Sequence, residues 1–182
     1  MRPRPRWLAL PLALVAIAAA ACGSSVFGSG LPDHGTISVH WTATNTANAT
    51  QAVITSTFQG TAGGVSLAGR SGGANAESAG SDYCYHCAVR VELTLDGKAI
   101  SLSGTATDNS SISVAGTIAG ERAAGTLSRS TATATGQSST WQLTGHWGSK
   151  TISATGTVVM HAPASAEAKA RGSFTGTYTL SG

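Results

Sequence analysis

Apolar residues recur at every second position along most of this chain. Ile37, Val39 and Trp41, for example, alternate with small polar residues and a histidine. Successive side chains of a β-strand point to opposite faces of a sheet, so this spacing predicts half-buried antiparallel strands. The segments with this pattern are 37–41, 89–95, 100–104, 112–118, 141–147, 152–158 and 174–180. The alternation therefore predicts an all-β domain.

Four short turns predict how these strands pair. The turns are Asp96-Gly97, Asp108-Asn109-Ser110, Gly120-Glu121 and Gly148-Ser149. In the same order, they pair Leu93 with Ile100, Leu102 with Gly116, Ile118 with Ala123, and Leu143 with Ala154. Every pair joins two residues of the inward series, and a slip of one residue would set apolar side chains against polar ones. The agreement among the turns predicts a continuous up-and-down meander.

Glycine occupies inward positions in five of the predicted strands. The positions are Gly104, Gly116, Gly145, Gly156 and Gly176. Glycine weakens a strand, so a recurring inward glycine needs a structural reason. Tight coiling of the sheet is such a reason, and we expect Trp141 to cover the gap at Gly156. We therefore predict a closed or nearly closed barrel of roughly nine or ten strands, with a β-sandwich as the alternative.

This expected architecture resembles lipocalin- and avidin-type barrels, although the sequence carries the signature of neither family. Two segments are expected to depart from the strand pattern. Ala162–Arg171, with Pro163 near its start and Gly172 after it, predicts one short helix. Gly60–Gly80 is rich in glycine, but a phosphate-binding loop needs a strand-to-helix setting that is missing here. We therefore expect this segment to be a flexible loop.

The first 21 residues are typical of an export signal. Arginines at positions 2, 4 and 6 precede the apolar run Trp7–Ala21. This run has 15 residues, whereas a membrane-spanning helix needs about 20. Small residues end the run before Cys22, as expected at a cleavage site. An exported protein with a removable leader is therefore predicted.

The end of this leader resembles the lipobox of bacterial lipoproteins. It reads Ala19-Ala20-Ala21-Cys22 and is followed by Gly23, although the family usually carries Leu where Ala19 stands. The resemblance implies cleavage before Cys22, acylation of Cys22 with chains such as palmitate, and anchoring on the exported face of the cell membrane. Several acyl chains at about 0.8 kcal/mol per buried methylene hold a protein on a membrane far better than one. A plain secretory signal with a chance cysteine is the alternative.

The mature chain is expected to have a simple organisation. Residues 22–34 are small and polar and predict a flexible tether, and residues 35–182 predict a single all-β domain. Three of the eleven Lys and Arg residues lie in the leader, which leaves eight basic and eight acidic residues. A neutral mature surface gives no reason to expect nucleic acid as a partner. The membrane is expected as a partner only through the lipid anchor.

The cluster Cys84-Tyr85-His86-Cys87 is the one conspicuous chemical motif. In an oxidising envelope, two cysteines this close predict a short-loop disulfide between Cys84 and Cys87. A redox site would need the second cysteine to lead into a helix, whereas residues 88–95 predict a strand. A zinc site would need at least a third ligand, such as a remote histidine. Haem attachment would need His where Ala88 stands. Redox and metal roles remain alternatives to the disulfide.

No pattern in the sequence predicts catalysis. The four histidines outside the cysteine cluster lie in the tether, on polar strand faces or at a strand end, without a carboxylate or cysteine at a telling spacing; they are His34, His40, His146 and His161. G-x-S-x-G, S-x-x-K and Walker sequences are absent. We therefore expect no catalytic residue, cofactor or metal site, and a protein that is not an enzyme.

Four aromatic residues on the predicted inner face are the remaining candidates for function. They are Trp41, Trp141, Trp147 and Tyr178. Such residues fill a core, or they line a ligand cavity with apolar walls and few polar groups. We therefore expect a membrane-anchored binding or interaction module for a small molecule or an envelope partner. A structural surface-coat protein, and an enzyme whose site assembles from distant residues, are the alternatives.

Overall fold

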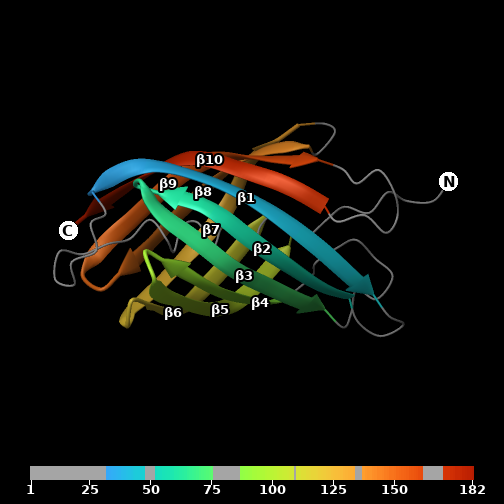
Figure 1. The fold of residues 1–182 in the computed structure, drawn as a ribbon, viewed down its shortest axis with the longest axis horizontal. Coiled ribbons are helices and arrows are strands. Elements are labelled where there is room, and N and C mark those ends of the chain that lie inside the picture. The colour runs from blue at the N-terminus through green and yellow to red at the C-terminus, as the bar shows by residue number, and fades with distance from the viewer. Residues whose placement is uncertain (1–31, 48–51, 76–86, 109, 134–136, 162–169) are drawn as a thin grey trace.

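A computed structural model describes residues 32–47, 52–75, 87–108, 110–133, 137–161 and 170–182. These residues form a closed barrel of ten antiparallel strands (Figure 1). The strands are β1 (His34–Ala47), β2 (Ala52–Ala62), β3 (Val65–Asn75), β4 (Cys87–Leu95), β5 (Lys98–Asp108), β6 (Ser111–Ile118), β7 (Glu121–Ala132), β8 (Ser138–Trp147), β9 (Lys150–His161) and β10 (Ala170–Ser181). Each strand pairs with its neighbours in sequence, and β1 closes the barrel by pairing with β10. The predicted meander and barrel are confirmed.

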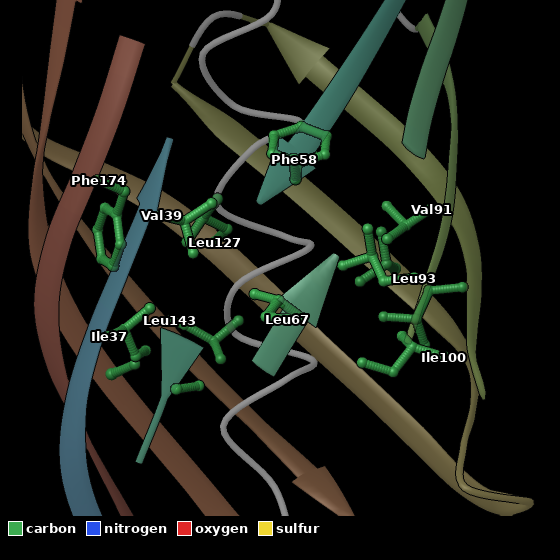
Figure 2. Close-up of a cluster of buried hydrophobic side chains, with 14 of the residues drawn as sticks. Ile37, Val39, Phe58, Leu67, Val91, Leu93, Ile100, Leu127, Leu143 and Phe174 are labelled. Atoms are coloured by element: carbon green, nitrogen blue, oxygen red, sulfur yellow. The ribbon is translucent and has the colours of Figure 1, made fainter. Parts of the chain in front are cut away.

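The alternation of the sequence becomes the inside and the outside of the barrel. In β6, Ile112, Val114 and Ile118 are buried, whereas Ser113 and Thr117 between them are exposed. Figure 2 shows buried side chains from opposite walls pointing into the same interior. Among the described residues, the one large hydrophobic side chain that is exposed belongs to Val159 in β9. The hydrophobic core is therefore the barrel interior.

Three of the four predicted hairpin registers are confirmed, and the hairpin between β6 and β7 differs. Ile118 pairs with Glu121 rather than with Ala123. The turn is Ala119-Gly120, with φ angles of 51° and 87°. Both residues have the left-handed backbone conformation that a type I′ turn requires, whereas the sequence analysis placed the turn one residue later, at Gly120-Glu121. The shift is two residues, so every side chain keeps its predicted face.

The glycine-rich segment that we expected to be a loop contains a strand. Residues 65–75 form β3, and Gly60 lies inside β2. Gly63-Gly64 joins these strands through a two-residue turn, with φ angles of 56° and 85°. A Cβ on Gly69 would overlap the backbone oxygen of Glu92 in β4, so glycine allows β3 and β4 to lie close together. Residues 76–80 of the expected loop lie outside the described residues.

Two smaller expectations also change. The predicted helix Ala162–Arg171 falls mostly outside the described residues, and its last two positions, Ala170 and Arg171, belong to β10. Their backbones extend the strand ladders instead, since Ala170 and Arg171 pair with β1 and Arg171 also pairs with β9. His34, assigned to the tether, is the first residue of β1 and pairs with Thr179.

Among the described residues, no helix has the length and hydrophobicity that crossing a membrane requires.

The inward glycines lie where neighbouring strands approach closely. A Cβ on Gly104, Gly116 or Gly145 would overlap a backbone carbonyl oxygen of the next strand. This agrees with the tight coiling that the sequence predicts, because such a clash cannot be relieved by moving a side chain. The nearest side chain to Gly156 is the ring of Phe174 in β10, whereas we expected Trp141, its partner across β8 and β9. An aromatic ring still covers the gap, but it comes from the other neighbouring strand.

The two ends of the barrel differ in how the strands are joined. At the tight-turn end, near the label C in Figure 1, the hairpins close through residues 63–64, 96–97, 119–120 and 148–149. The first residue of each turn donates a backbone hydrogen bond to the preceding hairpin or to β1, as Gly63 N–H does to the Thr36 oxygen at 2.9 Å. We call the opposite end, where β1, β3, β5, β7 and β9 finish, the distal end. Backbone hydrogen bonds thus connect each hairpin to the preceding one, and the first hairpin to β1, at the tight-turn end.

Candidate binding site in the distal half of the barrel

The predicted sites at the cysteines cannot be followed in the structure. Cys22 and Cys84 lie outside the described residues. Cys87 opens β4, where its backbone pairs with that of Ala106, and its side chain is not among those described. Lipid attachment at Cys22 and the disulfide between Cys84 and Cys87 therefore stay predictions.

The four aromatic residues singled out in the sequence are all buried and face the barrel interior. Trp41, Trp141, Trp147 and Tyr178 have relative exposures of 3%, 0%, 3% and 1%. Two of them belong to the tight-turn end, where their polar atoms reach backbone oxygens. Trp147 Nε1 donates to the Ile118 oxygen at 3.0 Å, and the Tyr178 hydroxyl donates to the Pro32 oxygen at 3.1 Å. These two residues therefore have a structural role at that end.

Trp141 lies in the distal half, and its indole N–H also has a hydrogen-bond acceptor. Its Nε1 donates to the Ser139 hydroxyl at 2.8 Å, and both residues are buried in β8. A strand places residues i and i+2 on the same face, so this pair is built within one strand. Trp141 and Ser139 thus form a closed polar contact that needs nothing further.

Trp41 is different from the other three aromatic residues. Its ring packs over Gly172, its partner in β10, and fills the space that a Cβ would take there. Its buried Nε1 has no hydrogen-bond partner among the described residues. An indole N–H can only donate, so this atom needs an acceptor that the described interior does not supply.

Two buried serines share this property, and the sequence reasoning missed both. Ser56 in β2 and Ser71 in β3 are directly paired, with relative exposures of 0% and 3%. Neither hydroxyl has a hydrogen-bond partner among the described residues. Two signals in the sequence could have found them. Ser56 precedes Phe58 in the inward series, and the turn Gly63-Gly64 fixes the register of β2 with β3.

The unpartnered atoms gather on one part of the inner wall. Ser56 pairs with Ala43, which is two residues beyond Trp41 in β1, so Trp41 is diagonal to Ser56. Side chains at directly opposite positions have Cβ atoms roughly 5 Å apart, and diagonal ones are about 7–8 Å apart. We call Trp41, Ser56 and Ser71 the inner polar cluster. It spans three neighbouring strands, β1, β2 and β3.

The wall around the inner polar cluster is apolar. Ala43, Phe58 and Val91 are the direct partners of Ser56, Trp41 and Ser71 across the strands, and all three are buried. In Figure 2, Phe58 and Val91 point into the barrel interior. A polar atom left unpaired in such surroundings costs about 1–3 kcal/mol. The cluster is therefore a place where a bound molecule with hydrogen-bonding groups would stabilise the protein.

Charged side chains are kept away from this interior. Among the residues whose side chains are described, no Asp, Glu, Lys, Arg or His is buried, and the buried polar residues besides the aromatic ones are Ser56, Ser71 and Ser139. The predicted surface positions of His40, His146 and His161 are confirmed, since all three are exposed. The described residues contain no group of three or more His, Cys, Asp and Glu side chains that could hold a metal ion.

An ion pair ties the start of the domain to the tight-turn end. Lys150 Nζ lies 2.9 Å from Asp33 Oδ1, and the backbone oxygen of Asp33 accepts a hydrogen bond from Leu180 N–H. The hydrogen bond and the charge of Lys150 lower the pKa of Asp33 below its ordinary value of 3.8. The chain therefore enters the barrel at the end away from the distal half.

A hollow of about 360 Å³ lies on the outer surface, over β4, β5 and β6. Exposed side chains such as Ser101, Ser103 and Thr117 line it. Its one charged residue, Arg90, is already paired with Glu92 at 2.6 Å, and both are largely exposed. The hollow therefore holds no unsatisfied buried group, in contrast to the inner polar cluster.

Comparison of the chain with protein-family models, with curated proteins and with solved structures gives no match.

Proposed function

We propose that this protein is an exported, lipid-anchored binding module that takes up a small ligand inside the distal half of its barrel. The observation that carries the proposal is the inner polar cluster. Trp41, Ser56 and Ser71 bury three polar atoms that have no partner among the described residues. Buried polar groups in proteins are nearly always hydrogen-bonded, so each exception needs an explanation.

The hydrogen bonds of the other buried aromatic side chains support a ligand as the reason for the unpaired groups. Trp141, Trp147 and Tyr178 each find an acceptor inside the same barrel. Among the described residues, three of the four buried aromatic side chains singled out in the sequence therefore find their acceptor within the chain, and Trp41 does not. In a structural coat protein, three unpaired groups on one wall would cost about 1–3 kcal/mol each unless ordered water paired with them. A bound molecule would recover this free energy.

The leader and the ion pair at Asp33 suggest how the barrel is presented. If Cys22 carries lipid, the chain advances ten residues from there to Pro32, whose oxygen accepts a hydrogen bond from Tyr178 at the tight-turn end. Ten extended residues reach at most roughly 33–36 Å. The lipid would therefore hold the tight-turn end near the membrane, and the distal half would face away from it. A ligand could then approach the inner polar cluster from the side of the cell exterior.

The test compares the wild type with two variants expressed in a bacterium. Wild type should fractionate with membranes and incorporate a labelled fatty acid, whereas Cys22→Ser should do neither. Native mass spectrometry of the folded wild type should detect a bound small molecule. Ser71→Leu should lose that molecule, because leucine removes one hydroxyl and places a larger apolar side chain directly opposite Ser56.

A melting curve establishes that Ser71→Leu is folded, and Ser71→Val serves in its place if leucine prevents folding. Equal fatty-acid labelling of wild type and Cys22→Ser would contradict the anchor. A wild-type protein that carries no small molecule and binds none from a bacterial lipid extract would contradict the binding function.

A further inference from the structure

We propose that the ligand is an uncharged molecule with an apolar body, and that it presents a hydrogen-bond-accepting oxygen to the inner polar cluster. This inference rests on the proposed binding function and specifies the chemistry of the ligand. Esters, amides, ethers and alcohols that carry hydrocarbon chains belong to this class. Carboxylates, amines and plain hydrocarbons do not.

The donors and acceptors of the cluster require an acceptor on the ligand. Trp41 Nε1 can only donate, whereas the hydroxyls of Ser56 and Ser71 can donate and accept. A ligand group that only donates would leave the indole N–H unpaired. A carbonyl oxygen can accept from the indole or from a hydroxyl, and its two lone pairs allow it to accept from both. The ligand must therefore carry at least one hydrogen-bond acceptor, because only an acceptor can pair with the indole N–H of Trp41.

The absence of a counter-charge limits the ligand to uncharged molecules. Of the residues whose side chains are described, no Lys, Arg, His, Asp or Glu is buried. A carboxylate brought to this wall would lose its hydration without gaining an ion pair, and this penalty greatly exceeds that for a neutral polar group. Two serine hydroxyls and one indole N–H recover part of this penalty, but no charged side chain that is buried among those described recovers the rest. The cluster therefore discriminates against charged head groups.

The surroundings of the cluster select an apolar body. Ala43, Phe58 and Val91 flank the three polar residues, and the buried core continues from them along the barrel. Neighbouring strands are about 4.8 Å apart, so a cluster on three strands spans about 10 Å. One small polar group can therefore reach two members of the cluster, while the rest of the ligand contacts hydrocarbon.

Three matched probes test this inference: methyl octanoate, octanoate ion and n-octane. They have the same chain length and differ in whether the head is a neutral acceptor, a charge or absent. Binding to folded, delipidated protein is measured by native mass spectrometry and by calorimetry. Methyl octanoate should bind at least about 5-fold more tightly than n-octane, since two hydrogen bonds together contribute at least about 1 kcal/mol. Octanoate should bind at least about 100-fold more weakly than the ester.

Variants at the inner polar cluster show whether its residues cause the difference in affinity between the ester and the alkane. Ser56→Ala and Ser71→Ala should each weaken ester binding about 3- to 10-fold and leave n-octane binding unchanged. Thr55→Ala is the matched control, because Thr55 precedes Ser56 on the exposed face of β2. The ratio of ester to alkane affinity is the decisive quantity, since a loss of structure would weaken both probes equally.

The outcomes separate this inference from the function on which it rests. If octanoate binds as tightly as its ester, or if the serine variants keep the wild-type ratio, the assignment of ligand class is wrong and the binding function stands. If none of the probes binds, and no ligand is recovered from a lipid extract, both proposals fail.

Discussion

The tight-turn end and the distal half of this barrel share one inner surface, but they differ in whether their buried polar atoms have hydrogen-bond partners among the described residues. At the tight-turn end, Trp147 and Tyr178 donate to backbone oxygens of Ile118 and Pro32. In the distal half, Trp41 and its two serine neighbours are as deeply buried and have no partner among the described residues. Burial alone therefore does not distinguish the two regions. Within the described part of the chain, the two regions differ in whether a backbone oxygen accepts a hydrogen bond from the buried side chains.

The connections between strands supply those acceptors. A two-residue turn reverses the chain within the barrel wall, and the hydrogen bond between hairpins holds the turns together, as from Gly148 N–H to the Arg122 oxygen at 2.8 Å. The Ile118 oxygen lies immediately before such a turn and accepts from Trp147. The Pro32 oxygen precedes β1 at the same end. The buried polar groups of the tight-turn end are thus paired within the chain, and the distal half is the region that we propose for a ligand.

The largest expected effect comes from adding volume near the tight-turn end. A Cβ on Gly116 would overlap the backbone oxygen of Ser101 in β5, which no rotamer change can relieve. Gly116→Val should therefore destabilise the protein by about 1–3 kcal/mol or more, as overpacking does. Thermal and urea denaturation of the purified domain measure this loss.

The matched control lies one residue further along β6. Thr117 is exposed, so Thr117→Val should change the free energy of unfolding by no more than about 0.5 kcal/mol. Strand propensity alone predicts the opposite order, because valine forms strands better than glycine. A Gly116→Val protein as stable as the wild type would mean that the inward glycines do not reflect tight coiling.

A smaller effect distinguishes the two regions directly. Trp147→Phe and Trp41→Phe remove the same atoms from buried positions, but only Trp147 loses a hydrogen bond. Trp147→Phe should therefore cost about 1 kcal/mol more than Trp41→Phe in urea denaturation of ligand-free protein. Equal losses for the two variants would remove the energetic difference between the tight-turn end and the distal half.

The smallest effect concerns the ion pair at the tight-turn end. Because Lys150 lowers the pKa of Asp33, the unfolded chain binds a proton more readily than the folded one. The pair therefore stabilises the fold at pH values above 3.8, and this contribution is lost as the pH falls through the lowered pKa.

Asp33→Asn should accordingly melt slightly below the wild type near neutral pH and at the same temperature in strong acid. Added salt should reduce the difference at neutral pH, since Asp33 is exposed. A difference in melting temperature that persists unchanged into strong acid would assign the effect to lost packing rather than to the charge pair.

The fold could be predicted from the sequence because its signal is local. The alternation in segments such as 89–95 fixes which side chains face inward, and a turn such as Asp96-Gly97 fixes the register with the next strand. The errors also have local causes. Ala119 adopts a left-handed conformation that favours glycine, and the glycines of β3 hid a strand whose apolar residues are few. The first error left every side chain on its predicted face, and the second concerned one strand of ten, so the barrel prediction survived both.

The candidate site was decided by the tertiary structure. The sequence by itself determined that Trp41 faces inward, and the same parity applies to Ser56 and Ser71. It could not determine that Trp147 meets an oxygen 29 residues away and Tyr178 one 146 residues away, while the inner polar cluster meets none among the described residues. A hydrogen bond requires its two atoms to lie within about 3 Å, and the closure of the barrel sets those separations. Period-two patterning assigns a side chain to a face, and only the assembled barrel decides what that side chain contacts.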